Sequence, residues 1–205
     1  MSIVRLSEYS IHKGSVVGAF RNSEAIAKGY KPRGCGREDP RIRNNDIQGA
    51  VAELSVCEWN GNDWDFSINK YNRESDIPGG IEVRSKQVSR DFMKLRPGCD
   101  SAKGEHIFVS VTRMYRDRLD VWRIDGWQWG KIIMAEPTVW VAYNDREKCE
   151  EWHYPVAKLL DTNSLRDEMR RRLEITRQAE AMKHRFEERE YACGAQDACA
   201  VEEVA

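Results

Sequence analysis

Apolar and polar residues alternate in several short segments of this chain, and longer segments with helical spacing lie between them. The clearest alternation is at residues 81–88, directly after a Gly-Gly pair that is typical of a turn. Successive side chains of a strand point to opposite faces. Glu82, Arg84 and Lys86 are therefore predicted to share one face of a strand, about 7 Å apart from one to the next.

The rest of the pattern predicts further helices and strands along most of the chain. Helical spacing indicates helices at residues 16–28 and 47–59, and residues 131–134 fit either a helix or a strand. Strands are predicted at residues 64–68, 105–112, around 121–124 and at 139–143. Helices and strands thus alternate, which favours a mixed α/β domain around a central sheet.

A long C-terminal helix is predicted because residues 164–189 contain neither Gly nor Pro. Its apolar stripe is formed by Leu165, Met169, Leu173, Thr176, Ala179, Met182 and Phe186. The stripe either packs on its own domain or forms the seam of a homodimer. We therefore expect an α/β domain at 1–162 with its core at 44–160, a helix at 163–192 and a disordered tail at 193–205.

Composition restricts how nucleic acid could be bound. Charged residues make up 33% of the chain, but the formal net charge is only −1, so a binding site for a polyanion has to be a local patch. A basic, turn-rich loop at residues 30–43 is the candidate patch, and the alternative is a solvated connector. Its arginines are Arg33, Arg37, Arg41 and Arg43.

No apolar run is long enough to span a bilayer, and no signal peptide is evident, so we expect an intracellular, cytoplasmic protein without a membrane partner. The six cysteines form no CxxC pairs and are expected to be free thiols. Cys99, His106, Cys149 and His153 could form a zinc site, although their spacing is not that of a zinc finger.

Carboxylates near the strand at 81–88 indicate a site for a hard cation. Asp76 precedes the Gly-Gly turn, Glu82 lies on the strand, and Glu53 lies among apolar residues of the predicted helix. Mg²⁺ or Mn²⁺ prefers such oxygen ligands, and a bound dication activates water for phosphodiester hydrolysis. The Val83 carbonyl could add a ligand. Each acid also has a simpler interpretation: Glu82 as a cross-strand partner and Asp76 as a turn residue. Glu53 could equally face the surface, with Glu58 as its competitor.

These residues resemble a group of small bacteriophage and prophage proteins related to the PD-(D/E)XK superfamily, which has the restriction-endonuclease-like fold. The matching segments are 49–54, 59–61, 75–77, 80–84, 108–111 and 125–127. The resemblance implies a mixed central sheet flanked by helices, with Asp76, Glu82 and Glu53 as metal ligands. It also implies a basic catalytic residue at Arg84, where the family pattern has Lys.

Two departures from the family pattern leave alternatives open. Arg84 stays charged and cannot transfer a proton, so Lys86 is a possible substitute. The short separation of Asp76 from Glu82 leaves Asp63 or Asp65 as alternatives for the first acid.

The resemblance implies a phage-encoded, metal-dependent nuclease that acts on DNA, with RNA not excluded, in the cytoplasm of the host. The alternative is a catalytically inactive nuclease-fold protein that binds nucleic acid or a host protein. Exposed tryptophans would favour this alternative if they stacked on bases or filled a partner's pocket. The candidates are Trp122, Trp127, Trp129 and Trp140, for which core packing is the simpler interpretation.

Overall fold

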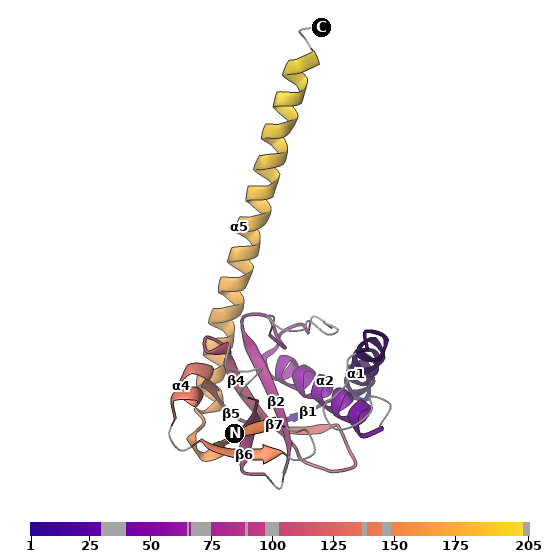
Figure 1. The fold of residues 1–205 in the computed structure, drawn as a ribbon, viewed down its shortest axis with the longest axis vertical. Coiled ribbons are helices and arrows are strands. Elements are labelled where there is room, and N and C mark those ends of the chain that lie inside the picture. Colours follow the sequence, from indigo (N-terminus) through magenta and orange to yellow (C-terminus); the bar gives the residue numbers. More distant parts are fainter. Residues whose placement is uncertain are drawn as a thin grey trace.

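Four strands form a central sheet in the order β1-β5-β4-β2, in which β2 occupies one edge (Figure 1). The computed structural model describes residues 1–29, 40–64, 66, 75–88, 90–96, 103–136, 139–144 and 149–202. The bounds of the four strands are β1 Ser2–Arg5, β2 Ile81–Gln87, β4 Ile107–Arg113 and β5 Val121–Trp129. β2 runs parallel to β4, whereas β1 and β4 are antiparallel to β5.

A second, smaller sheet has the order β3-β7-β6, with antiparallel pairing throughout. Its strands are β3 Phe92–Leu95, β6 Trp140–Asn144 and β7 Cys149–Pro155. A short helix, α4 (Gly130–Ala135), follows β5, and a 3-10 turn (Val156–Lys158) follows β7. The chain is therefore a mixed α/β protein, as the alternation of helical and strand patterns predicts.

The two faces of the central sheet pack against different partners. Val83 and Val109 lie in the larger apolar core together with residues of α2 (Pro40–Asn60) and the first turns of α5 (Thr162–Glu202). Phe108, on the other face, packs with Met93 and Tyr154 of the smaller sheet. Because Glu82 is in register with Phe108, its side chain belongs to the face opposite to α2.

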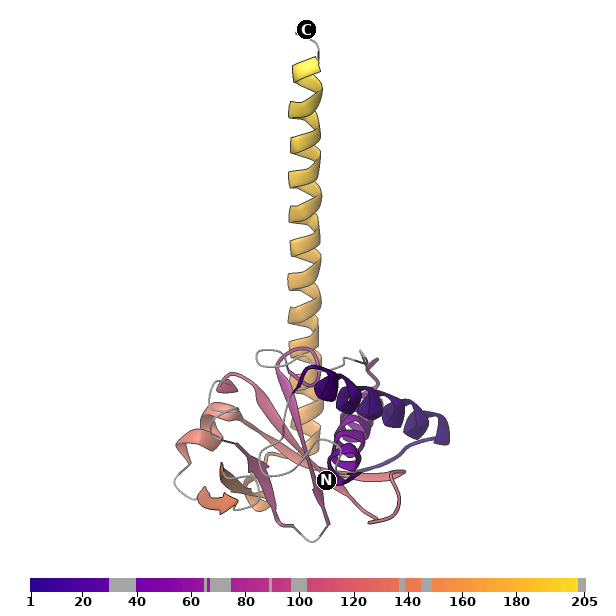
Figure 2. The same ribbon diagram turned by 45° about the vertical axis from the view of Figure 1, so that its right-hand side comes forward.

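Helix α1 (Glu8–Ala27) lies along the outside of α2, and glycines permit the close approach (Figures 1 and 2). A Cβ atom added at Gly18 would come within 2.4 Å of the Ile47 Cα atom, and one at Gly14 within 2.8 Å of the Val51 side chain. Ser7 caps the start of α1 by accepting a hydrogen bond from the Ser10 N–H (3.0 Å). This packing places one face of α1 directly over α2.

The long helix α5 leaves the body of the protein at one end and extends well beyond it (Figure 2). Leu165 and Met169 are fully buried, whereas Met182, farther along the predicted stripe, is 65% exposed. The stripe therefore packs on the domain only through the first turns. No described helix is long and apolar enough to cross a membrane.

The structure confirms the predicted strands near 81–88, 105–112, 121–124 and 139–143, and it shows that residues 131–134 are helical. The helix boundaries were less accurate. α1 begins at Glu8 rather than near 16, because Ser7 provides the cap, and α5 continues to Glu202 rather than ending near 192. Several alanines after residue 191 favour this extension. The rest of the predicted tail, residues 203–205, lies outside the described residues.

Two other predictions about local structure were wrong. Trp64 and Phe66 do not lie in a strand, and residues 67–70 lie outside the described residues. Residues 30–39 of the predicted loop lie outside the described residues, and residues 40–43 are helical because α2 begins at Pro40, a residue that favours the first turn of a helix. Arg41 and Arg43 therefore belong to a helix and not to a loop.

Candidate functional site

Three oxygen atoms converge on the guanidinium group of Arg84 near the start of β2. Arg84 Nη1 donates to Asp76 Oδ2 (3.3 Å) and to the Val83 carbonyl (3.2 Å), and Nη2 donates to Glu82 Oε2 (3.2 Å). The Val83 N–H, on the outer edge of β2, also donates to Asp76 Oδ2 (2.8 Å). Asp76 is thus fastened to the free edge of the strand, and Arg84 joins it to Glu82.

The other carboxylate oxygen of Glu82 accepts hydrogen bonds from the segment that precedes β4. Lys103 Nζ lies 2.6 Å from Glu82 Oε1, and His106 Nδ1 lies 3.1 Å from the same oxygen. Burial raises the pKa of Glu82, but the His106 hydrogen bond and the charges of Arg84 and Lys103 outweigh it and lower the pKa to about 2. Glu82 is therefore a fully buried carboxylate that stays ionised.

Asp76 has the opposite electrostatic character, although it shares Arg84 with Glu82. Burial and the neighbouring charge of Glu82 raise the pKa of Asp76, while Arg84 and the Val83 N–H favour its charged form. Its side chain remains 30% exposed. Asp76 is thus the more accessible of the two carboxylates.

Glu53 approaches the same edge from the α2 side of the sheet. Arg21, one turn beyond the Gly18 contact between α1 and α2, donates to both oxygens of Glu53 at 2.6 Å. Burial raises the pKa of Glu53 to about 7, and the charge of Asp76 contributes to the rise, although Arg21 opposes it. Glu53 is 5% exposed, so it lies next to the core and not on the surface, the two positions that the sequence left open.

Lys86 does not join this cluster. Its Nζ atom donates to Thr112 Oγ1 (2.6 Å) and to the Arg90 carbonyl (2.8 Å), and it lies 3.1 Å from Asp125 Oδ2. The pair is buried, with Lys86 only 4% exposed. Lys86, the predicted substitute for Arg84, lies one pleat beyond Arg84 on β2 and is paired with Asp125 of β5 rather than with Asp76 or Glu82.

The donor set at Arg84 consists of hard oxygen atoms, which is the type that Mg²⁺ and Mn²⁺ prefer. Two carboxylates and one carbonyl would hold such a cation, and Arg84 provides the positive charge between them. Among the residues that the structure describes, no group of three or more His, Cys, Asp or Glu side chains is placed to hold a metal ion. Glu53 in particular is engaged by Arg21 rather than directed to Arg84.

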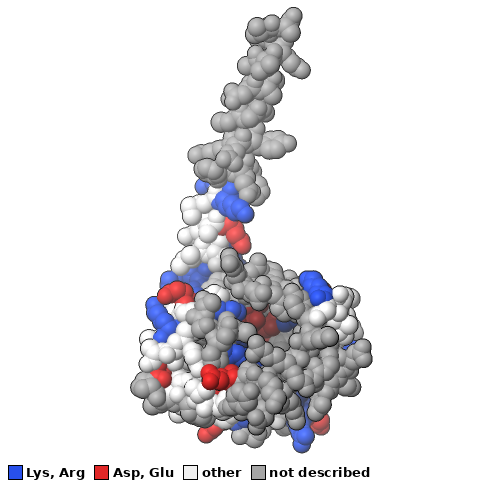
Figure 3. Space-filling view, viewed as in Figure 1, with Lys and Arg blue, Asp and Glu red and all other residues white. Residues whose placement is uncertain are grey.

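The other predicted residues are only partly described. Arg33, Arg37, Asp65 and Cys99 lie outside the described residues, as do the side chains of Arg41 and Cys149. Arg43 and Asp63 are exposed. The proposed zinc ligands are not supported, since His106 contacts Glu82 and His153 lies 3.3 Å from Glu151. Acidic and basic side chains are mixed on the face shown in Figure 3, without a large basic surface among the described residues.

The tryptophans mainly serve packing. Trp122 and Trp127 are buried, and their indole N–H groups donate to the Leu119 carbonyl (2.7 Å) and to Ser164 (3.1 Å). Neither ring is available to stack on a base. Trp129 is half-buried beside Arg172, and the side chain of Trp140 is not described.

Three partners of the acidic residues were not predicted from the sequence: Arg21, Lys103 and His106. A usable signal existed for two of them. Lys103 precedes the predicted strand at 105–112 and His106 lies at its start, so a parallel pairing of that strand with 81–88 would place them beside Glu82. No local pattern indicated that the pairing is parallel.

Comparison with known proteins gives no match to this chain: no protein-family model, curated protein or solved structure is significantly similar to it.

Proposed function

We propose that this protein is a metal-dependent nuclease that hydrolyses phosphodiester bonds in DNA, with its site at the start of β2. The observation that supports this most directly is the convergence of Asp76 Oδ2, Glu82 Oε2 and the Val83 carbonyl on one cationic group. The resemblance of the acidic pattern to the PD-(D/E)XK superfamily, and to its restriction-endonuclease-like fold, is a second line of support.

The residues would divide the work as follows. Asp76, Glu82 and the Val83 carbonyl would hold Mg²⁺ or Mn²⁺, which when bound lowers the pKa of water and polarises phosphoryl oxygens. Arg84 keeps the two carboxylates together, and its planar guanidinium suits a phosphate group. Glu53, whose raised pKa marks an under-compensated carboxylate, is the auxiliary acid at the edge of the site.

Asp76→Asn is the best variant for testing the proposal, because Asp76 is partly exposed and its replacement should leave the fold intact. Wild type should cleave single- or double-stranded DNA with Mg²⁺ or Mn²⁺ and not in EDTA. Asp76→Asn should lower the rate at least about 100-fold, as for other groups that stabilise transition-state charge. Asp167→Asn, at an exposed position on α5, is the matched control.

Circular DNA, linear DNA and RNA should all be assayed, since the acids themselves do not select among them. Asp63→Asn tests the alternative choice of first acid: loss of cleavage in that variant, with Asp76→Asn active, would transfer the role to Asp63. Equal activity of wild type and Asp76→Asn, or none in either on any substrate, would show that the metal-dependent nuclease is the wrong function for this site.

A non-catalytic binding protein is the second candidate, and one observation favours it. All three acids already have cationic partners, namely Arg84, Lys103 and Arg21, so the cluster is charge-compensated without a metal ion. Such a protein would bind nucleic acid, or a protein partner, in EDTA as well as in Mg²⁺. Fluorescence anisotropy with labelled oligonucleotides separates the two candidates, because binding without cleavage under any metal supports the second.

Self-association through α5 stays a prediction. Ile175 and Met182 are 52% and 65% exposed on the part of the helix that leaves the body. Light scattering of the full chain and of a chain ending at residue 174 would test it. A dimer that becomes a monomer on truncation would support the seam, whereas an unchanged monomer would contradict it.

A further inference from the structure

Glu82 has two oxygen atoms with different neighbours, and only one of them faces Arg84. Oε2 accepts from Arg84, whereas Oε1 accepts from Lys103 Nζ at 2.6 Å. We propose that Lys103 is the phosphate-binding amine of this site, which donates a hydrogen bond to a non-bridging oxygen of the scissile phosphodiester. This proposal rests on the nuclease function proposed above and assigns it a residue that lies outside the acidic sequence pattern.

Lys103 has hydrogen-bonding capacity to spare. An ammonium group carries three N–H donors, and within the described part of the chain only the bond to Glu82 uses one of them. The Lys103 side chain is 17% exposed, so it is held firmly beside a buried carboxylate while still reaching solvent. A cation in this situation can contact a substrate anion without first losing its own partner.

The segment that carries Lys103 is fixed at both ends by backbone hydrogen bonds. The His106 N–H donates to the Lys103 carbonyl, and the Lys131 N–H donates to the Gly104 carbonyl, each at 2.9 Å. The next residue, Ile107, donates to the Gly80 carbonyl at 2.9 Å, which ties the segment to the turn before β2. The amine is therefore held in place before substrate arrives, as a group that stabilises charge requires.

The other cations near β2 are less suited to this role. Arg84 already donates to Asp76, Glu82 and the Val83 carbonyl, and Lys86 is buried against Asp125. His106 also donates to Glu82, and its ring lies next to Gly80, where an added Cβ would meet it at 3.3 Å. His106 is accordingly a positioning residue, which fixes the Glu82 carboxylate from the side opposite to Arg84.

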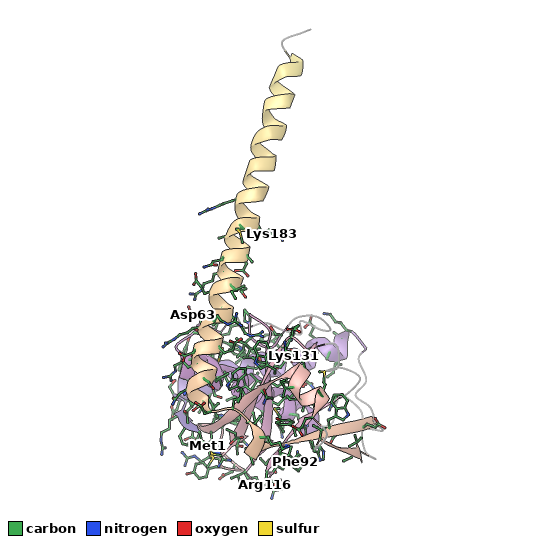
Figure 4. The ribbon with its side chains drawn as sticks, turned by 90° about the vertical axis from the view of Figure 1, so that its left-hand side faces the viewer. Met1, Asp63, Phe92, Arg116, Lys131 and Lys183 are labelled. Atoms are coloured by element: carbon green, nitrogen blue, oxygen red, sulfur yellow. The ribbon has the colours of Figure 1, made fainter. Side chains whose placement is uncertain are left out.

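The test compares Lys103→Met, Lys103→Arg and the control Lys131→Met in DNA cleavage. Lys131 is a 55% exposed lysine on α4 that lies near the end of the body from which α5 projects (Figure 4). Lys103→Met should lower kcat at least about 100-fold with less than about a threefold change in KM, because the lost hydrogen bond strengthens as charge develops on phosphorus. Lys103→Arg should retain activity within about tenfold, and Lys131→Met should match wild type.

Thermal unfolding of each variant shows whether it folds. If Lys103→Met does not fold, Lys103→Arg still tests the role, because it keeps a positive charge beside Glu82. An active wild type with kcat of Lys103→Met within threefold would overturn the role of Lys103 and leave the nuclease function standing. So would a loss in folded Lys103→Arg as complete as in Lys103→Met. A wild type that cuts no nucleic acid with any metal would overturn both proposals.

Discussion

Glu82 and Glu53 are both buried glutamates at the same edge of the central sheet, but they have opposite electrostatic properties. The pKa of Glu82 is lowered to about 2, whereas that of Glu53 is raised to about 7. Burial acts on both in the same direction, towards a higher pKa. The difference comes from their partners: Glu82 contacts Arg84, Lys103 and His106, while Glu53 has Arg21 and feels the charge of Asp76.

This contrast shows that burial alone does not decide the charge of a carboxylate. At Glu82, one hydrogen-bonding histidine and two cations outweigh the loss of hydration. At Glu53, a single arginine opposed by a nearby carboxylate does not. Glu82 is consequently an ionised anchor for the cations around it. Glu53 gains and loses its proton near neutral pH, where a change in the charge of its surroundings has the largest effect.

The largest expected effect is that of removing the charge of Glu82. Glu82→Gln leaves Lys103 without a counter-charge and Arg84 with that of Asp76, and should lower the free energy of unfolding by about 3 kcal/mol at pH 8. Glu53→Gln should cost less than about 1 kcal/mol at that pH, because the charge that it removes was itself unfavourable. Urea unfolding of both variants measures this difference. Equal losses in the free energy of unfolding would contradict the opposite electrostatic properties of the two glutamates.

The pH dependence of stability should differ in sign between the two glutamates. The raised pKa of Glu53 gives stability that is fully present below 4.5 and is lost as pH rises through about 7, roughly 3 kcal/mol in all. The lowered pKa of Glu82 gives about as much stability above 4.5, lost as pH falls through about 2.

Chemical unfolding between pH 2 and 8 would separate the two contributions. Asp76 has a raised pKa like Glu53, so the difference between wild type and Glu53→Gln is the quantity to follow. That difference should change between pH 4.5 and 7, and the difference for Glu82→Gln should change below 4.5. A Glu53→Gln difference that stays constant over its window would contradict the raised pKa.

Gly130→Ala should change the pKa of Glu82 indirectly, through the segment that carries Lys103. A Cβ atom at Gly130 would lie 2.5 Å from the Lys103 carbonyl and 3.0 Å from the Phe108 ring, so the segment that carries Lys103 has to shift. We expect a loss of about 2 kcal/mol in stability and a higher pKa for Glu82. Carboxyl carbon chemical shifts measured during a pH titration would report it, and an unchanged Glu82 pKa would argue against this coupling.

The smallest expected effect is that of a substitution in the helix that carries Glu53. Gly49 lies in α2, and an added Cβ would meet no atom of the described residues within 4 Å, apart from the neighbouring backbone of its own helix. Gly49→Ala should therefore stabilise the protein by about 0.5–1 kcal/mol through helix propensity and leave the pKa of Glu53 unchanged. Thermal unfolding and the same titration check both points, and a destabilised variant would mean that the position has a close neighbour.

The sequence predicted the parts of the site that depend on local pattern. The alternation after the Gly-Gly pair correctly placed Glu82 and Arg84 on one face of a strand, whereas the apolar neighbours of Glu53 left its burial open. Long-range contacts were not predictable in the same way. The contact of Lys103 with Glu82 depends on parallel pairing of β2 with β4, and the contact of Lys86 with Asp125 depends on an irregularity in the pairing of β4 with β5.

Two strands of the fold, β1 and β3, were not predicted for the same reason. β1 and β3 have four residues each, too few for a period-2 pattern to be recognised, and both are defined by distant partners. Arg21 reaches Glu53 only because Gly14 and Gly18 let two helices approach closely. Spacing within one segment does not indicate such a packing partner.

The base of α5 lies against the turn that leads into β2, and one arginine of α5 makes the contact. Arg172 donates to the Gly79 carbonyl (2.7 Å) and to the Glu105 carbonyl (2.8 Å), and so hydrogen-bonds to the two backbone segments that flank Glu82. At 1.5 Å per residue, the 41 residues of α5 form a rod about 60 Å long. Arg172 therefore connects the base of this rod to both backbone segments beside Glu82.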